Sequence, residues 1–213
     1  MIKIENTVVP HGEQWKSLIL GARNAMNSWD RSDSEFVQVC GDFEWEYHIG
    51  NNDLDLMTRL SKAGTDHRKF MRMIVVYADI TAPLYWWKEY DTYKIGTVAN
   101  SCSTMHKIHE KEFTLDDFSC EHLVTASMFC LNSTVEQLNW CREAFLETND
   151  KSCWYQMIQL LPSSYNQKRT VMLNYEVLRN MYHSRKNHKL DEWRTFCDFI
   201  KELPYAKELI CNE

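Results

Sequence analysis

The stretch that decides the fold is Leu161-Pro-Ser-Ser-Tyr-Asn-Gln-Lys-Arg-Thr170, followed by a segment that carries Asn174, Asn180 and Arg185. The pattern of apolar residues predicts a helix over residues 170–185. On that helix Asn174 and Arg185 would share one face, because eleven residues make about three turns, and Asn180 would point about a third of a turn away. Amides and a guanidinium on an otherwise apolar helix suit a nucleobase or a phosphate. A polar outer stripe is the simpler reading of the same pattern.

Three further helices are predicted around this stretch. Residues 190–203 form one, and residues 154–161 form a short one that Pro162 stops. Ser133-x-x-Glu136 reads as a capping box at the start of another helix. The helix over residues 190–203 carries one apolar stripe, made of Leu190, Trp193, Phe196 and Ile200.

The N-terminal half mixes helix and strand signals. Helices are predicted over residues 13–26 and 53–62, a buried strand over residues 70–80, and a helix from Pro83 to about residue 90. Between the first two helices, alternating runs at 37–40 and 43–49 flank Gly41-Asp42, which is typical of a β-hairpin. The sequence therefore predicts an α+β fold with more helix than strand.

Composition and charge limit the function classes. The chain has 213 residues, 44% of them apolar and 13% aromatic, which is enough for a packed core. A net charge of −6 argues against binding of duplex nucleic acid, which favours a positively charged protein. No run of residues is long and apolar enough for a membrane helix. Eight cysteines without a C-x-x-C pair favour a reducing, cytoplasmic compartment. Without repeats or linkers, we expect one domain over residues 1–213, with a hairpin insertion at about 30–52.

Other polar segments are candidates for chemistry. The basic run from Gly64 to Phe70 enters the predicted strand, where it could hold a phosphate or be a solvated connection. The hydroxyl-rich run from Thr97 to Thr104 could line a ligand or satisfy its own backbone. His106 and His109 have the spacing of a metal pair, but no further ligands accompany them, so we expect no metal site.

Taken in order, these segments resemble the flavin-dependent thymidylate synthases. The family has an Ala-Arg-x-Ser element, then Glu-His before a strand, then Ala-Pro, Arg-His-Arg and Ser-x-Asn-Glu-x-Ser-x-Arg. The corresponding positions in this chain are Ala22-Arg23-Asn24, Asp66-His67, Ala82-Pro83, Thr92-Tyr93-Lys94 and Asn100-Ser101-Cys102-Ser103-Thr104-Met105.

The C-terminal part of the resemblance is closer. The family continues with Leu-Pro, a threonine-rich turn, a helix with Asn, Asn and Arg, and then His-Ala-Gln-x-Glu-Ile-Arg. This chain follows the same order with Leu161-Pro162, Thr170, Asn174, Asn180, Arg185, His188, Glu192 and Arg194. The likeness extends over about residues 21–204, apart from the hairpin and the middle of the chain.

The resemblance implies a central, mostly antiparallel sheet flanked by helices, in a homotetramer whose sites are shared between subunits. It also implies binding of FAD and of the pyrimidine nucleotide dUMP, which the family methylates at C5 with methylenetetrahydrofolate and NADPH. Ser103 and Arg185 would be catalytic. The expected cofactor contacts are His67, Tyr93, Lys94, Asn100, Asn174, Asn180 and His188. The expected substrate contacts are Arg23, Ser101, Ser103, Arg169 and Arg185.

The departures from the family pattern leave other functions open. Where the family has Arg-His-Arg, this chain has Thr92-Tyr93-Lys94, and it therefore lacks two planar cations that suit bidentate phosphate contacts. Instead of an enzyme, the chain could be a nucleotide-binding module, a sensor or sponge from a phage or mobile element. It could also be an interaction protein that uses Trp45, Trp86 and Trp87 if these are exposed.

Overall fold

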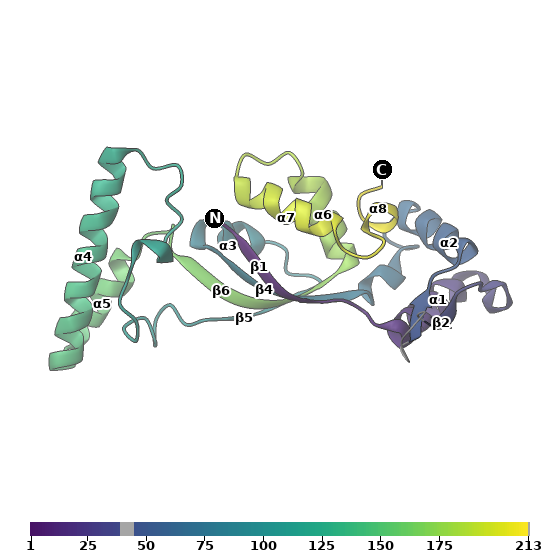
Figure 1. The fold of residues 1–213 in the computed structure, drawn as a ribbon, viewed down its shortest axis with the longest axis horizontal. Helices are drawn as coiled ribbons and strands as arrows, with labels where there is room; N and C mark the ends of the chain where they lie inside the picture. The colour runs from purple at the N-terminus through teal and green to yellow at the C-terminus, as the bar shows by residue number, and fades with distance from the viewer. Residues whose placement is uncertain (39–44, 213) are drawn as a thin grey trace. The chain divides into compact units, whose positions relative to one another are not determined.

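The computed structural model describes residues 1–38 and 45–212. The fold is α+β, with an antiparallel sheet flanked by helices (Figure 1), as predicted. The four strands of the sheet lie in the order β1-β4-β6-β5. Their bounds are Lys3–Val8 for β1, Val75–Pro83 for β4, Asn166–Asn174 for β6 and Thr97–Ser101 for β5. The sequence did not predict β1 or β5 as strands.

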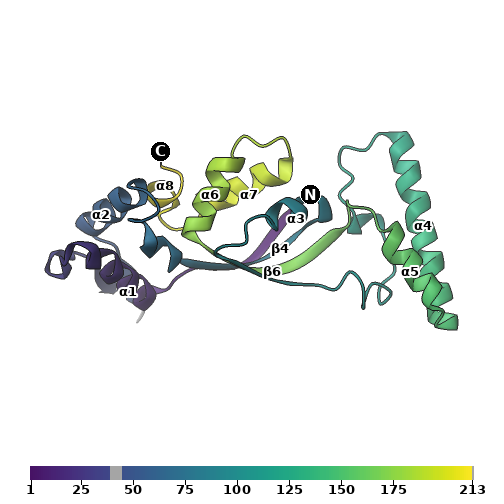
Figure 2. The ribbon, with the colours of Figure 1, turned by 180° about the vertical axis from the view of Figure 1, so that it is seen from behind.

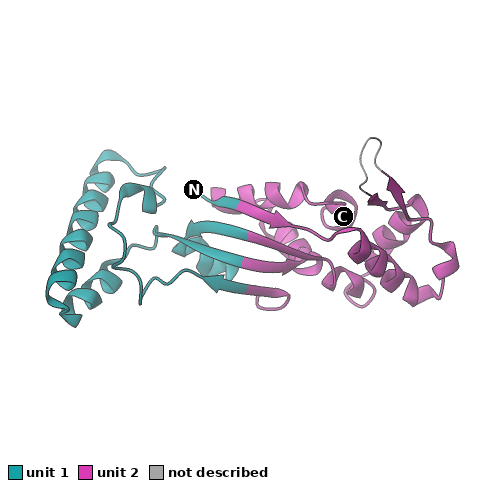
Figure 3. Cartoon of the chain, turned by 60° about the horizontal axis from the view of Figure 1, so that its bottom comes forward, with its two compact units in different colours: residues 1–4, 79–92, 99–170 teal, residues 5–78, 93–98, 171–213 magenta. Residues whose placement is uncertain are grey.

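The chain forms two compact units (Figure 3), and each strand of the sheet has residues in both. Unit 1 comprises residues 1–4, 79–92 and 99–170. Its helices are α3 (Leu84–Tyr90), α4 (Thr125–Thr148), α5 (Lys151–Leu160) and the short η4 (Leu115–Asp117). Both views of the ribbon show α4 and α5 side by side (Figures 1 and 2). Their shared core contains Leu131, Val135, Leu138, Cys141 and Met157.

The aromatic helix α3 is a core element of unit 1. Trp86, Trp87 and Tyr90 are buried and contact one another, with ring centroids 4.8 to 5.3 Å apart. The indole Nε1 of Trp87 donates a 3.0 Å hydrogen bond to the carbonyl of Gln167 in β6. This burial argues against Trp86 and Trp87 as an interaction surface, whereas Trp45 is exposed.

Unit 2 comprises residues 5–78, 93–98 and 171–213. Its helices are α1 (Gly12–Arg23), η1 (Asn24–Met26), η2 (Trp29–Arg31), α2 (Asn51–Lys62), η3 (Lys69–Arg72), α6 (Tyr175–Arg185), α7 (Asp191–Lys201) and α8 (Ala206–Leu209). Buried side chains from α1, α2, α6 and α7 include Ile19, Met57, Leu178, Trp193, Phe196 and Ile200. The last three belong to the predicted apolar stripe of α7.

The predicted hairpin is present. Strands β2 (Glu35–Gln38) and β3 (Trp45–His48) pair antiparallel, with Phe36 opposite Tyr47. The aromatic rings of this pair lie 4.8 Å apart. The predicted turn at Gly41-Asp42 lies outside the described residues.

Two predicted helix starts were wrong. The helix predicted to begin at the Ser133 capping box begins at Thr125 instead, because the preceding residues continue the same helix and place Ser133 and Glu136 in its interior. The helix predicted over residues 170–185 begins only at Tyr175, because Thr170 to Asn174 belong to strand β6. Asn174 is therefore the residue that caps α6 and not a residue on its face.

Other predicted bounds hold approximately. Strand β4 begins at Val75 and not at residue 70, since η3 occupies the residues before it. The helices predicted from residue 13, residue 53, Pro83 and residue 154 match α1, α2, α3 and α5. No helix of residues 1–38 and 45–212 is long and apolar enough to cross a membrane.

Candidate functional site

Arg185, the last residue of α6, is held between two aromatic rings. Its Cζ lies 4.8 Å from the ring centroid of Trp193 and 5.7 Å from that of Tyr93. Its Nε donates a 3.0 Å hydrogen bond to the Oη of Tyr93. The two rings meet edge to face at 6.0 Å. The structure thus fixes the plane of one guanidinium with two cation–π contacts and one hydrogen bond.

Helix α6 is itself firmly anchored. The N–H of Tyr175 donates to the carbonyl of Ile74, and the Oη of Tyr175 donates a 2.7 Å hydrogen bond to the carbonyl of Pro204. The buried guanidinium of Arg179 donates to the carbonyls of Leu209 and Ile210. These contacts tie α6 to the residue that precedes β4 and to the C-terminal residues, so the position of Arg185 is set by the unit as a whole.

A tight turn holds Tyr93 in place. Gly96 has φ +84°, a left-handed conformation that favours glycine. The carbonyl of Gly96 accepts a 3.2 Å hydrogen bond from the N–H of Asn174, and the hydroxyl of Thr97 donates to the carbonyl of Tyr93. The side-chain oxygen of Asn174 accepts from the N–H of Val177, as an N-cap does. Asn174 therefore links the turn to the start of α6.

His188 completes this cluster. Its ring lies 6.3 Å from that of Trp193, edge to face, and its Nδ1 accepts a 3.2 Å hydrogen bond from the N–H of Leu190. The N–H of His188 donates to the carbonyl of Arg185. The structure thus brings together four predicted residues of unit 2: Tyr93, Asn174, Arg185 and His188.

The remaining predicted residues of unit 2 with exposed side chains are His67, Lys94 and Asn180. His67 lies in a turn, where its N–H donates to the carbonyl of Gly64. The neighbouring Arg68 forms a 3.2 Å ion pair with the buried Glu176. Much of the basic segment before β4 therefore anchors α6, while His67 stays accessible.

Four predicted residues belong to unit 1. Asn100 and Ser101 are exposed on β5. The Oγ of the exposed Ser103 accepts hydrogen bonds from the N–H groups of Met105 at 3.3 Å and His106 at 2.9 Å.

Arg169, the fourth of these residues, is the most constrained of them. Its Cζ lies 4.2 Å from the ring centroid of Trp87. Its Nη1 donates to Asp91 at 2.7 Å and its Nε donates to Gln167 at 3.0 Å. These contacts hold the guanidinium against the surface of α3.

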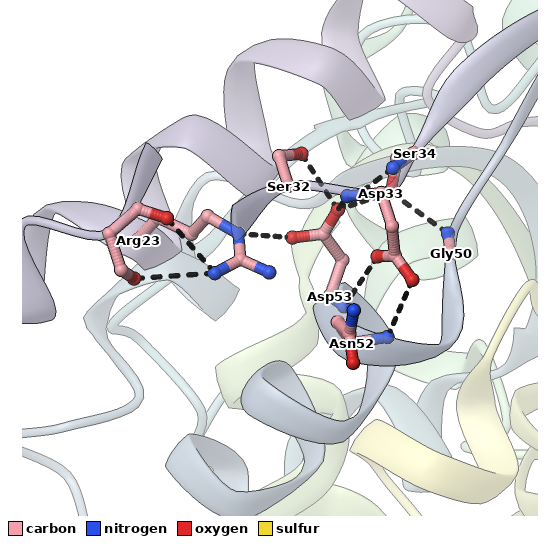
Figure 4. Close-up of polar contacts among 8 residues, drawn as sticks. Arg23, Ser32, Asp33, Ser34, Gly50, Asn52 and Asp53 are labelled. Carbon is pink, nitrogen blue, oxygen red and sulfur yellow. Dashed lines mark hydrogen bonds and ion pairs between the residues drawn. The ribbon is translucent and has the colours of Figure 1, made fainter. Parts of the chain in front are cut away.

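Arg23 is buried in a separate polar cluster of unit 2 (Figure 4). Its Nε forms a 2.5 Å ion pair with Asp53, and its Nη1 donates to the carbonyl and hydroxyl of Ser28. The second oxygen of Asp53 accepts from the hydroxyls of Ser32 and Ser34 and from two backbone N–H groups. Burial raises the pKa of Asp53, but the hydrogen bonds from Ser34, Ser32 and Arg23 outweigh it and hold the pKa below its usual value.

The Arg23 cluster borders the wall of a cavity of about 890 Å³. Three arginines and three aspartates line it, and the pair Arg59–Asp55 is joined by a 2.9 Å ion pair. The carboxylate of Asp33 accepts from the N–H groups of Asn52 and Asp53. Arg23 and Asp33 therefore join the segment around the end of α1 to the start of α2, whereas the pair Arg59–Asp55 lies within α2.

His106 and His109 lie at a different cavity, of about 440 Å³, with Phe145 and Trp154. The ring of His109 contacts that of Phe145 at 4.9 Å. Among the described residues there is no group of three or more side chains that could hold a metal ion.

Of the comparisons with known proteins, the one with solved structures identifies the fold. No family model matches the sequence, and no curated protein matches it. A crystal structure of the flavin-dependent thymidylate synthase from Helicobacter pylori, complexed with FAD and dUMP, matches with a TM-score of 0.69 and 15% identity, covering 98% of this chain and 97% of that one. A second structure of that enzyme with FAD and dUMP matches with a TM-score of 0.65 and 17% identity, covering 98% and 96%.

This chain has the fold of a flavin-dependent thymidylate synthase. At such low identity the likeness shows the fold alone. Within this thymidylate synthase fold, sequence reasoning missed three residues that shape the cluster or its surroundings. Trp193 was expected only as a core residue, Gly96 was not singled out, and Asp53 was assigned only to a helix. The left-handed turn at Gly96 and the partner of Arg23 depend on contacts that are distant in sequence.

Proposed function

We propose that the chain binds dUMP and FAD, with Arg185 as the principal cation for the nucleotide. The observation that carries the proposal is the fixed guanidinium of Arg185 between Tyr93 and Trp193. A guanidinium already held in one plane loses less side-chain entropy when it binds a phosphate or a carbonyl. The resemblance assigns this position to the nucleotide, and the similar solved structure contains dUMP.

The side chains at the expected flavin positions fit such a ligand chemically. Lys94 is an exposed cation suited to a pyrophosphate, and Asn180 is an exposed amide that offers both a donor and an acceptor to a ring edge. His67 and His188 add two imidazoles that can donate or accept. The side-chain oxygen of Asn174 already accepts from the N–H of Val177, and the side chain is buried. FAD, when bound, would supply hydride transfer.

The chain's own residues would bind and orient the substrate. Arg185 would hold the nucleotide. The resemblance also assigns Ser101, Ser103 and Arg169 to the nucleotide, in a family whose sites are shared between subunits. The Oγ of Ser103 accepts from two backbone N–H groups, so its own hydroxyl hydrogen remains a donor for the substrate. Transfer of a one-carbon unit to C5 of dUMP would use methylenetetrahydrofolate and NADPH. We further propose the homotetramer that the resemblance implies, which light scattering would test.

Binding without catalysis is the second candidate function. The segment Thr92-Tyr93-Lys94 carries one cation, and Tyr93 uses its hydroxyl on Arg185. A site with fewer cations favours a nucleotide-binding protein that has lost the flavin-dependent reaction.

Three measurements on the purified protein test the proposal. A visible flavin absorbance band, before or after adding FAD, is expected, and calorimetry is expected to show dUMP binding. The variant R185Q should weaken dUMP binding about 10- to 100-fold, since hydrogen bonds to charged groups contribute roughly 1.5–3 kcal/mol. R59Q is the matched control, because Arg59 is an exposed arginine on α2.

The outcomes separate the two candidates. Tritium release from C5-labelled dUMP in the presence of FAD, NADPH and methylenetetrahydrofolate would establish the enzyme. Binding of dUMP without tritium release would favour the binding protein. Protein that binds neither FAD nor dUMP would exclude the enzyme, and protein that binds no nucleotide in a thermal-shift screen would exclude the binding protein.

A further inference from the structure

Gln167 is a buried polar side chain to which the proposed function gives no role. It lies on β6, is 7% exposed, and has both partners of its side-chain amide in unit 1. Its Oε1 accepts a 3.0 Å hydrogen bond from the Nε of Arg169, and its Nε2 donates a 2.7 Å hydrogen bond to the carbonyl of Cys102. A buried amide with a partner on each side holds those partners in place, because losing either bond leaves a buried polar group unsatisfied.

The two partners also fix the direction in which the amide points. The Nε of Arg169 can only donate and the carbonyl of Cys102 can only accept, so a reversed amide would oppose two donors and two acceptors. Arg169 is itself held, since its Cζ lies 4.2 Å from the ring centroid of Trp87 and its Nη1 donates to Asp91 at 2.7 Å. Gln167 therefore presents its amide NH₂ group to Cys102 in one orientation.

The bond to Cys102 acts on the peptide that leads into Ser103. The carbonyl of Cys102 and the N–H of Ser103 belong to one planar peptide group. On the other side of Cys102, its N–H donates a 2.9 Å hydrogen bond to the carbonyl of Lys168. The backbone just beyond β5 is thus held to β6 twice, once through the backbone and once through the side chain of Gln167.

Ser103 and Gln167 line the same cavity. This cavity of unit 1 has a volume of about 440 Å³, and Cys102 lies in its wall with them. The Oγ of Ser103 accepts a 2.9 Å hydrogen bond from the N–H of His106, which limits rotation of the side chain. The place of the hydroxyl at the cavity wall therefore depends on the backbone that Gln167 holds.

We propose that Gln167 is a positioning residue that holds the hydroxyl of Ser103 where it meets the nucleotide. This inference rests on the proposed function, which assigns Ser103 to dUMP. It adds a residue that acts on Ser103 only through the peptide of Cys102. Its substitution should therefore weaken dUMP binding only as long as the Ser103 hydroxyl is present.

The test is a double-mutant cycle on the dissociation constant of dUMP, measured by calorimetry. Q167E keeps an oxygen for Arg169, whose charge keeps the new carboxylate ionised, and it loses the donor to Cys102. We expect Q167E to weaken dUMP binding about three- to fivefold and S103A about fivefold, the effect of one hydrogen bond. When both changes are combined, Q167E should add less than about twofold to the loss caused by S103A.

Two further variants accompany the cycle. Q167L removes both hydrogen bonds of the side chain and should weaken dUMP binding at least as much as Q167E. Q159L is the matched control, because Gln159 is an exposed glutamine on α5 in the same unit, and it should leave dUMP binding unchanged. Circular dichroism checks that each variant folds, and if one of the two Gln167 variants does not, the other decides.

The possible failures are distinguishable. If the unaltered protein binds no dUMP, the proposed function itself fails, and if S103A binds dUMP as tightly as the unaltered protein, the assignment of Ser103 fails. If S103A weakens binding but the Gln167 variants do not, only the positioning role is overturned. Equal losses from Q167E with and without the Ser103 hydroxyl would also overturn it, because that result indicates general damage to the fold.

Discussion

The side chain of Asn174 occupies the space that a Cβ on Gly96 would need. A Cβ built on Gly96 would lie 2.6 Å from the Nδ2 of Asn174, while the N–H of Asn174 donates to the carbonyl of Gly96. The turn that carries Tyr93 and the cap of α6 are therefore packed against each other, and each restricts the other.

Replacing Gly96 by alanine should destabilise the protein by roughly 2 kcal/mol, since φ is positive and the new methyl group would contact Asn174 closely. Urea denaturation would measure the change. G21A is the control: Gly21 lies inside α1, and its nearest contact for a Cβ is the Sδ of Met73 at 3.8 Å. That variant should gain about 0.5–1 kcal/mol from helix propensity. Destabilisation of both variants alike would contradict the role of the turn.

Asn174 and Asn180 lie on the same segment and have different roles. N174A should cost about 1 kcal/mol of stability, because it removes the side-chain cap of α6. N180A, at an exposed helical position, should leave stability unchanged or raise it by a few tenths of a kcal/mol. If Asn180 contacts flavin as proposed, N180A should weaken FAD binding in a fluorescence titration. Equal losses of stability in N174A and N180A would contradict the proposal that only Asn174 stabilises the fold.

The Arg23–Asp53 pair should control stability at acidic pH. D53N leaves the buried Arg23 without its counter-charge and should cost about 3 kcal/mol at neutral pH. D55N removes an exposed i,i+4 pair instead, and should cost less than ~0.5 kcal/mol.

The pH dependence of that effect has a definite sign. The folded-state pKa of Asp53 lies below the ordinary value of 3.8, so the unfolded chain binds the proton more tightly. The stabilisation from the charged carboxylate is complete above pH 3.8 and is lost as the pH falls below that value. Urea denaturation at a series of pH values from neutral to acidic should show that the free energy of unfolding falls less with decreasing pH in D53N than in the unaltered protein. If the free energy of unfolding falls equally steeply with decreasing pH in D53N and in the unaltered protein, Asp53 does not cause the loss of stability in acid.

Ser103 should matter to the nucleotide more than to the fold. The side chain is exposed and contacts only the backbone of its own turn, so S103A should cost no more than about 1 kcal/mol of stability. Under the proposed function it should lower tritium release from dUMP by at least about tenfold, the effect of one lost transition-state hydrogen bond. S163A is the control, because Ser163 is another exposed serine of unit 1, and that variant should keep full activity. Unchanged activity in S103A would remove Ser103 from the catalytic assignment.

Local patterns predicted those elements whose signals are contained in short segments. The stripe of Trp193, Phe196 and Ile200 indicated α7, and the alternating runs at 37–40 and 43–49 indicated the hairpin. The order of Asn174, Asn180 and Arg185 along the chain led to the fold that the structural comparison supports. Helices and strands of this kind can be predicted because their periodicities repeat within a few residues.

Other features required the tertiary structure. Residues 170–174 carry a pattern that fits a helix, and only pairing within the sheet makes them part of β6. Ser133 and Glu136 have the spacing of a capping box, but the residues before them are equally helical, so no end is formed there. Short apolar segments fit either a helix or a strand, and the contacts with neighbouring strands decide which of the two forms.

By itself, the sequence determined the α+β class, the amphipathic helices and the set of polar residues that are candidates for binding a ligand. The tertiary structure decided what each of these residues contacts. It placed Tyr93 and Trp193, a hundred positions apart in sequence, on the same guanidinium, and it buried Arg23 against Asp53. Such pairings depend on distant segments packing together, and a local pattern carries no information about a partner that the chain meets only when it folds.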